Sequence, residues 1–464
     1  MFLLRRITLA ALLICLLTAF CACSGDSSAS SHSLAPTLPG AASIHNTPPE
    51  SKESASPLSE ASSGKPETAP ASPPSSSAPV ETTTPEASLP SSDPAETLPE
   101  SSEESSAPPT TEVDIREALR PRAEEYMAHM DLRSKLFPLM IVSPEANCWM
   151  NPVTTPEDDL LPSRPVAGLL FQAKNMENPQ QLTALVEGRQ ASSLLPLFIC
   201  VDEEGGRVSR IIPTMGTTPI KNMYTYRGDG TEKARKNART LATDISRFGF
   251  NLNFAPVADV WSNPENQVIG ERAYGDDFQK TARLVASAVK GFHDANIICT
   301  LKHFPGHGDT LEDSHNQIAM VHKSAEELRT QELLPFIAGI EAGADMVMSG
   351  HLMVPAIDPE NPATFSHLII TKLLREELGF QGVIITDALE MGGAQTVSSG
   401  GEACLKALLA GHDLLLCPEE QPEKLSDCVD NLLEAVESGL LSEERIDESL
   451  LRVLTLKLQY GLLK

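Results

Sequence analysis

Eight short apolar runs, separated by longer amphipathic stretches, constrain the fold of this chain most strongly. The runs lie at residues 136–142, 166–171, 195–201, 250–255, 297–301, 345–348, 383–385 and 414–417. Each is short enough for a buried strand and too short for a helix. Strands that alternate with helices form a parallel sheet, and eight such units favour a closed (β/α)8 TIM barrel of the α/β class. No GxGxxG motif follows the first run, which disfavours a dinucleotide-binding fold.

The stretches between the runs have helical periodicity. In the segment 278–293, apolar residues recur on one helix face, at Leu284, Val285, Ala288, Val289 and Phe292. The segment 422–438 shows the same pattern, and Gly439 follows it where a helix is expected to end.

The N-terminal quarter of the chain has a different composition. Ser, Thr or Pro occupies 49 of the 89 positions from 24 to 112, with few aromatic or branched aliphatic residues. Such a segment cannot bury enough apolar surface to offset its ordering entropy, so it is predicted to be a disordered Ser/Pro/Thr/Glu-rich linker. One catalytic domain is then expected at residues 113–464, a length that suits a single barrel.

Residues 1–23 have the layout of a bacterial lipoprotein signal peptide. Arg5 and Arg6 precede an apolar run at 7–20, and Cys23 resembles the cysteine that becomes acylated. The alternative is an ordinary leader that is cleaved nearby without lipid. An uncleaved anchor is disfavoured, because about 14 apolar residues fall short of the roughly 20 that span a bilayer. The domain is therefore expected outside the cell, either anchored to the outer face of the cytoplasmic membrane through Cys23 or secreted.

Charge and cysteine content exclude further classes. The formal net charge is −27, and the linker holds only 13 acids and 2 bases, so much of the excess negative charge belongs to the barrel. An acidic surface argues against nucleic-acid binding. The six cysteines after the leader have no paired spacing and are expected to be buried thiols, although a disulfide of Cys428 with Cys404 or Cys417 stays open.

Polar residues follow five of the predicted strands. They are Asp202 after the third, Asp259 beyond the fourth, Lys302 and His303 after the fifth, His351 after the sixth and Asp387 after the seventh. Barrel enzymes carry their chemistry at the carboxyl ends of the strands, so these side chains are expected at one rim.

The segment KHFPGHGDTLEDSH, residues 302–315, holds the densest set of reactive groups. Asp313 and His315 lie two positions apart, so in extended backbone the carboxylate can hold one imidazole nitrogen and leave the other for proton transfer. The alternative is a turn residue beside a solvated histidine. A metal site of His303, His307, Asp309 and His315 is disfavoured, because the FPG break prevents helical ligand spacing. No metal or cofactor is expected.

Asp387 ends the apolar run GVIIT, and a carboxylate there is costly unless it is paired or functional. It is the natural nucleophile, with a structural ion pair as the alternative. Charged side chains from other loops, with Met391 and Tyr274 as apolar walls, suit a hydroxylated ring.

These motifs resemble glycoside hydrolase family 3, in particular its single-domain bacterial β-N-acetylglucosaminidases, also called β-N-acetylhexosaminidases. The matching segments are VDEEGGRVSR, NFAPVADV, IGERAYG, KHFPGHGDTLEDSH, SGHLMVPAID, GVIITDALEMGG and the tail 441–461. Glu203 stands where the family usually has Gln, Ala273 where Ser is common and Gly350 where Ala is common. The acid at Glu203 is expected to alter sugar affinity.

The resemblance implies Asp387 as catalytic nucleophile, and Asp313 with His315 as an acid/base dyad on a mobile loop. It implies a second set of residues that bind the N-acetylglucosamine ring: Asp202, Arg210, Arg272, Lys302 and His303, with Met391 near the sugar. The expected function is a retaining, exo-acting β-N-acetylglucosaminidase for cell-wall glycan or muropeptides. A β-N-acetylglucosaminide phosphorylase, a β-glucosidase and a non-catalytic wall-binding lipoprotein are the alternatives.

Overall fold

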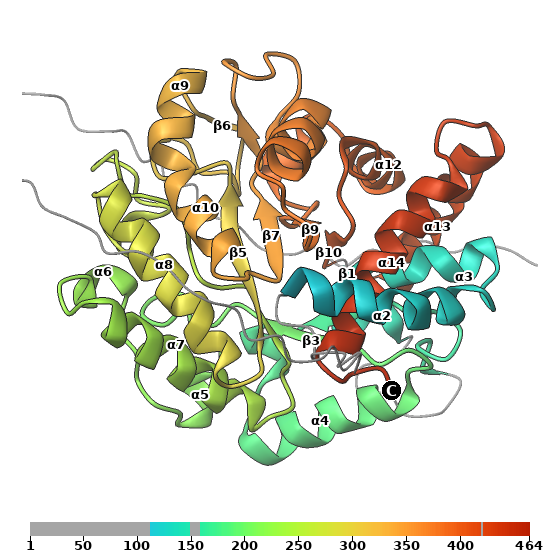
Figure 1. Cartoon of the computed structure of the whole chain (residues 1–464). Coiled ribbons are helices and arrows are strands. Elements are labelled where there is room, and N and C mark those ends of the chain that lie inside the picture. The colour runs from blue at the N-terminus through green and yellow to red at the C-terminus, as the bar shows by residue number, and fades with distance from the viewer. Residues whose placement is uncertain (1–111, 149–157, 419–420) are drawn as a thin grey trace, which may run out of the picture. The chain divides into compact units, whose positions relative to one another are not determined.

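The computed structural model describes residues 112–148, 158–418 and 421–464 (Figure 1). The predicted leader with Cys23, and the predicted linker up to residue 111, lie outside the described residues. Among the helices of the described part, none is both long and apolar enough to cross a membrane.

A parallel eight-stranded sheet, in the order β10-β1-β2-β3-β4-β5-β7-β9, forms the centre of the domain. An isolated parallel bridge between Ile385 and Leu414 joins its two edges, so the sheet curls into a nearly closed barrel. Each predicted run supplies one strand, and the barrel prediction is confirmed. The strands are β1 (Met140–Val142), β2 (Gly168–Leu170), β3 (Phe198–Val201), β4 (Leu252–Asn253), β5 (Ile298–Phe304), β7 (Met346–Ser349), β9 (Val383–Thr386) and β10 (Leu415–Cys417).

Five of the eight strands are shorter than the apolar runs that predict them, whereas β5 is longer. The first run begins as helix, in α3 (Leu132–Leu136) and a 3-10 turn (Phe137–Leu139), before β1 starts. Strand β5 continues past its apolar run through Lys302 and His303, whose side chains are buried. These polar residues interrupt the apolar pattern, so the sequence does not reveal the extension. Both side chains have partners in the barrel mouth: Lys302 contacts Asp202 and Glu204, and His303 contacts Asp259.

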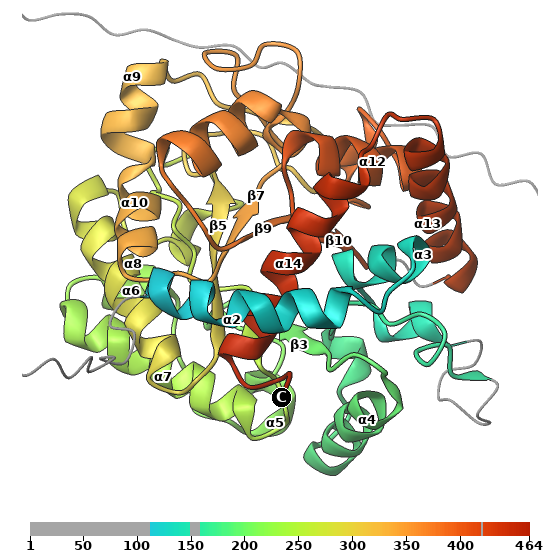
Figure 2. The same cartoon turned by 45° about the vertical axis from the view of Figure 1, so that its right-hand side comes forward.

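Helices surround the barrel and connect its strands (Figures 1 and 2). The predicted helical segments are confirmed as α8 (Phe278–His293), which buries all five predicted apolar residues, and α13 (Pro422–Glu437), which ends before Gly439. The other longer helices are α2 (Glu112–Met127), α4 (Pro179–Ser192), α7 (Thr231–Ser246), α10 (Leu334–Glu341), η8 (Leu368–Glu377), α12 (Gly400–Ala410) and α14 (Glu443–Gln459). Strands β6 (Ala319–Met320) and β8 (Leu352–Met353) form a separate parallel pair.

Helix α14 closes the N-terminal end of the barrel. Its Val453 and Leu456 pack with inward side chains of the strands, among them Phe198 and Ile385. The buried ammonium of Lys457 donates hydrogen bonds to the carbonyls of Ala167 and Pro196. Figure 2 shows α2 crossing α14 at this end. The opposite, carboxyl end of the strands is therefore the one left for a site.

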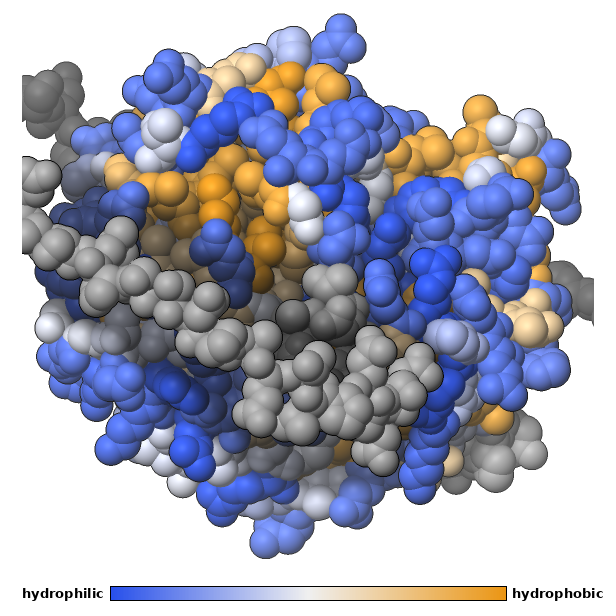
Figure 3. All heavy atoms as spheres, in the orientation of Figure 1, coloured by the Kyte–Doolittle hydropathy of each residue, from blue (hydrophilic) through white to orange (hydrophobic). Residues whose placement is uncertain are grey.

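The outer surface and the cysteines agree with the composition. Hydrophilic side chains cover much of the face in Figure 3, and the apolar groups visible there gather in its upper half. All six cysteines of the described part are buried, and none of them forms a disulfide, so the prediction of buried thiols is confirmed. The sulfur atoms of Cys404 and Cys417 lie 3.8 Å apart, a pair that the spacing did not indicate.

Candidate active site

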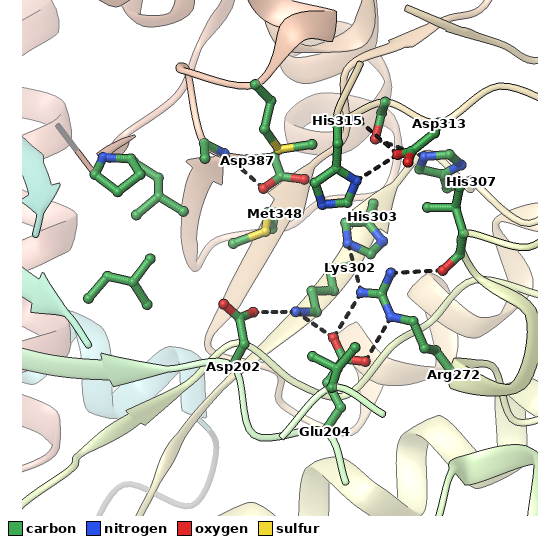
Figure 4. A pocket seen from close by; sticks show the side chains of 18 of the residues that line it. Asp202, Glu204, Arg272, Lys302, His303, His307, Asp313, His315, Met348 and Asp387 are labelled. Carbon is green, nitrogen blue, oxygen red and sulfur yellow. Dashed lines mark hydrogen bonds and ion pairs between the residues drawn. The ribbon is translucent and has the colours of Figure 1, made fainter. Parts of the chain in front are cut away.

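A cavity of about 600 Å³ lies at the carboxyl ends of the strands (Figure 4). All nine sequence-predicted side chains of the site line it, although they come from six different parts of the chain. They are Asp202, Arg210, Arg272, Lys302, His303, Asp313, His315, Asp387 and Met391.

A buried network of two cations and two acids forms one wall. The ammonium of Lys302 donates to Asp202 at 2.6 Å and lies 2.8 Å from Glu204. Arg272 grips Glu204 with two parallel hydrogen bonds of 2.9 and 2.8 Å. Burial raises the pKa of Glu204, but Arg272 and Lys302 outweigh burial and hold it well below its usual value. Glu204 therefore stays ionised between the two cations, and Asp202 is the most exposed member of the network.

His303 is held from behind by Asp259. Its Nδ1 lies 2.7 Å from Oδ2 of Asp259, whose carboxylate also accepts the backbone N–H groups of His303 and His307. Burial raises the pKa of Asp259, but His303 and His307 together outweigh burial and lower it. The imidazole thus has a fixed orientation, and its Nε2 lies 3.5 Å from the guanidinium of Arg272 at the cavity wall.

Asp387 follows directly after β9 and projects into the same cavity. Its Oδ1 accepts the N–H of Ala388 at 2.8 Å. Burial raises the pKa of Asp387, but His303, His351, this N–H and Lys302 together lower it below its ordinary value. A carboxylate that stays ionised without a direct ion pair in the described structure can act as a nucleophile.

Asp313 and His315 form a hydrogen-bonded pair at the cavity mouth. Nδ1 of the imidazole lies 2.6 Å from Oδ1 of Asp313, which also accepts the backbone N–H of His315 at 3.0 Å. Burial raises the pKa of Asp313, but its bonds to His315 lower it more. Nε2 of His315 is left to face the cavity, where Figure 4 shows the imidazole and the Asp387 carboxylate on the same side.

The loop that carries this pair docks on the turn after Asp387. The N–H of Gly392 donates to the carbonyl of His315 at 2.9 Å, and the N–H of Gly393 donates to that of Ser314 at 3.1 Å. A Cβ atom on Gly393 would lie 2.7 Å from the Ser314 oxygen, so this approach requires glycine. The dyad and the nucleophile therefore share one backbone support.

Buried His307 supports the same loop from inside. Its ring nitrogens lie 2.8 Å from the hydroxyl of Thr310 and 2.9 Å from that of Ser314. Burial, reinforced by His303, lowers the pKa of His307 to about 4, so the ring is neutral. The four side chains considered for a metal site, which include this one, have separate partners.

Two residues singled out in the sequence lie outside the cavity lining. Tyr274 is not a cavity wall, because it is buried in the core and packs edge-on against Tyr226. His351 lies behind the cavity, where it contacts Thr364 and the carbonyl of Ala388. The prediction for Tyr274 is wrong, because its place in the IGERAYG segment does not fix which way the side chain points. His351 does follow β7 at the predicted rim, but its ring lies outside the cavity lining.

Glu203 also lies outside the cavity lining. Its carboxylate accepts hydrogen bonds from the hydroxyl of Ser209 and from the N–H groups of Arg210 and Ile211, the last two at 2.7 and 2.6 Å. Burial raises the pKa of this carboxyl above its usual value. Glu203 thus anchors the segment that presents Arg210 to the cavity, whereas the sequence suggested an extra acid beside the sugar.

Sequence reasoning overlooked several lining residues, namely Gln172, Glu204, Arg207, Gln267 and Met348. Glu204 is the most important, since it pairs with both buried cations. Its signal was the second glutamate in the motif DEEGGR, one residue farther from the strand than Glu203. The neighbouring residues in the sequence do not indicate which of the two glutamates points into the cavity.

Comparisons with known proteins agree with these features. Residues 132–456 match the model of the glycosyl hydrolase family 3 N terminal domain. The chain is 35% identical over 341 residues to Beta-hexosaminidase A of Pseudoalteromonas piscicida, a match covering 68% of this chain and 57% of that protein. It is 40% identical over 298 residues to the Beta-hexosaminidase of Stenotrophomonas maltophilia strain K279a, covering 62% of this chain and 85% of that protein.

A solved structure is similar as well. It is a glycoside hydrolase family 3 β-N-acetylglucosaminidase from Paenibacillus sp. str. FPU-7, with a TM-score of 0.67 and 38% identity. The similarity covers 72% of this chain and 63% of that one, so the chain spans less than two thirds of this structure and of the Pseudoalteromonas protein.

Proposed function

Because the chain belongs to glycosyl hydrolase family 3, we propose that it is a retaining, exo-acting β-N-acetylglucosaminidase. It would release terminal, non-reducing, β-linked N-acetylglucosamine. The observation that carries this proposal is that one cavity is lined both by a half-buried, ionised Asp387 and by an imidazole oriented by Asp313. A nucleophile and an acid/base group that face one space are the minimum for retaining hydrolysis.

In the first step, the Asp387 carboxylate attacks the anomeric carbon and the bond to the leaving oxygen breaks. Nε2–H of His315 donates its proton to that oxygen, and a glycosyl ester of Asp387 forms. In the second step, His315 accepts a proton from water while the water oxygen attacks the anomeric carbon. The ester breaks, Asp387 leaves as carboxylate, and the sugar keeps its configuration.

The charged wall supplies the sugar contacts. Asp202 is partly exposed to the cavity, and its bond to Lys302 fixes the carboxylate for hydroxyl groups of the ring. Arg272 and Lys302 are themselves held by Glu204, so they do not collapse on Asp387. Arg210 and Met391 also line the cavity. Ring hydroxyls match such a mixture of charged donors and acceptors.

The proposed substrate is cell-wall glycan or released muropeptide. Relatives named β-hexosaminidase support the acetamido sugar, and the leader-like residues 1–23 support a site of action outside the cell. A lipid on Cys23 would anchor the enzyme to the outer face of the membrane. In a cell-fractionation assay, Cys23→Ala should then move the protein from the membrane to the soluble fraction and abolish labelling by palmitate.

The direct test offers the purified chain p-nitrophenyl β-N-acetylglucosaminide and the β-glucoside separately, with and without phosphate. We expect turnover of the acetamido sugar at a rate at least tenfold above the glucoside, with free sugar as product in both phosphate conditions. Preference for the glucoside would indicate a β-glucosidase, and sugar 1-phosphate a phosphorylase. Bound glycan without any product would indicate a wall-binding protein.

The assays with phosphate test whether phosphate can replace water in attacking the glycosyl ester. Most retaining glycosidases place a second carboxylate beside the ester, where it repels an incoming anion. A neutral imidazole at His315 repels phosphate less than a carboxylate would.

A further inference from the structure

Three side chains of different chemistry meet at the N-terminal end of the barrel, opposite the active site. They are the imidazole of His293 in the last turn of α8, the thiol of Cys299 early in β5, and the carboxylate of Asp345 just before β7. One ligand atom from each lies within 4.8 Å of the other two. Within the described ranges, no second trio of His, Cys, Asp or Glu ligand atoms is this compact.

The spacing of these atoms suits one small cation. Nε2 of His293 lies 3.0 Å from Oδ2 of Asp345 and 3.7 Å from the sulfur of Cys299. A tetrahedral zinc ion, with bonds of about 2.0–2.3 Å, separates its ligand atoms by roughly 3.2–3.6 Å. The two separations from His293 are within a few tenths of an ångström of this range, and the sulfur of Cys299 lies within 4.8 Å of the Asp345 oxygen, so a modest closure would bring all three atoms onto one ion. Nitrogen and sulfur ligands favour zinc and its neighbours over Mg²⁺ or Ca²⁺.

Surrounding groups orient the carboxylate as the outer partners of metal ligands do. The hydroxyl of Tyr460 donates to Asp345 at 2.8 Å, and the N–H of Cys299 donates to its Oδ2 at 3.0 Å. Asp345 also borders a second cavity of about 340 Å³, and the His293 side chain is 28% exposed. The partly exposed imidazole thus gives a hydrated ion a route to the cluster.

We propose that His293, Cys299 and Asp345 bind a divalent transition-metal ion of the zinc type, in a structural site remote from the proposed catalytic cavity. The bound ion would join the end of α8 to the starts of β5 and β7. A proton competes with the metal ion for the imidazole nitrogen of His293. Burial lowers the pKa of His293, but its hydrogen bonds to Asp345 and Cys299 outweigh burial and raise it to about 11. A metal-free protein would hold the same three groups as an ion pair with a buried thiol.

The test uses Co²⁺ as a spectroscopic probe on the purified whole chain after treatment with a chelator. Binding should produce an intense thiolate-to-cobalt charge-transfer band that saturates at one ion per chain and is displaced by Zn²⁺. Cys299→Ser should abolish the band. Cys428→Ser, which replaces another buried cysteine far from the cluster in sequence, is the matched control and should retain it. His293→Gln should weaken Co²⁺ binding at least tenfold.

Thermal unfolding provides a second readout. Zn²⁺ should raise the Tm of the parent chain and leave that of Cys299→Ser unchanged, because only a ligand bound by the folded state stabilises it. The absence of a band in the folded parent chain would overturn the proposal. So would a band that survives in Cys299→Ser and disappears in Cys428→Ser, since the thiols of α12, β10 and α13 would then hold the ion. If Cys299→Ser does not fold, the His293→Gln comparison decides.

Discussion

Oδ1 of Asp313 lies 2.6 Å from Nδ1 of His315 and, at the same time, accepts the backbone N–H of His315 at 3.0 Å. One oxygen therefore fixes both the ring and the peptide that carries it. The negative charge also stabilises the imidazolium that forms when His315 takes a proton from water.

We predict that Asp313→Asn lowers kcat by about 10²–10⁴-fold, by analogy with orienting carboxylates in other enzymes. The substitution keeps the side-chain shape and removes the charge, so the circular dichroism spectrum and Tm should change little. Steady-state kinetics measure the effect. A kcat within twofold of the parent chain would reduce Asp313 to a turn residue.

A second prediction concerns the contact between the catalytic loop and the turn after Asp387. Gly393→Ala should push the loop away, because the new Cβ atom would meet the Ser314 oxygen at 2.7 Å. Misplacing the acid/base group by about 1 Å should lower kcat/KM roughly 100-fold. Gly188→Ala in α4 is the matched control, since its Cβ atom would meet nothing within 4 Å. Equal kinetics for both variants would show that the docking has no catalytic role.

Two substitutions of Glu203 distinguish the effect of its hydrogen bonds, which position Arg210, from the effect of its negative charge. In Glu203→Gln, the amide oxygen can still accept from the N–H groups of Arg210 and Ile211, and the amide nitrogen can donate to the Ser209 hydroxyl. We therefore expect kcat and KM within about threefold of the parent chain. Glu203→Ala leaves those buried N–H groups without a partner and should raise KM several-fold by releasing Arg210. If Glu203→Gln raised KM as strongly as the alanine variant, the charge itself would matter.

The lowered pKa of Lys457 should make the free energy of unfolding depend on pH. Burial, opposed by Cys200, lowers its pKa from the ordinary 10.5 to about 7. Between these two values the unfolded chain binds more protons than the folded chain, so this residue makes stability rise with pH from about 7 to about 10.5. Lys457→Met should remove that contribution. The Tm difference between Lys457→Met and the parent chain is measured from pH 7 to pH 10, and a difference that stays constant would contradict the assignment.

The barrel could be predicted because each buried strand is a separate apolar run bounded by helical stretches. Asp202, Lys302, His303 and Asp387 were found for the same reason, since strand ends converge on one rim. The Asp313–His315 pair was visible in its spacing. These residues could be found because they are either close together in sequence or placed at the same rim by the barrel fold.

Other relationships depend on contacts that the sequence does not encode locally. Arg272 selects Glu204 rather than Glu203 across 68 residues. Tyr274, two positions beyond Arg272, turns into the core instead of the cavity. His293, Cys299 and Asp345 have no metal-like spacing, because the barrel alone brings the starts of β5 and β7 beside the end of α8.

The most direct test of the proposed mechanism is to trap the glycosyl ester on Asp387. The purified chain is incubated with a 5-fluoro N-acetylglucosaminyl fluoride, digested and analysed by mass spectrometry, with Asp387→Asn as control. The account predicts one sugar residue on the peptide that contains Asp387, no adduct in the control, and a control kcat that is lower by orders of magnitude. Full turnover by Asp387→Asn, or a sugar attached to a different residue, would contradict it.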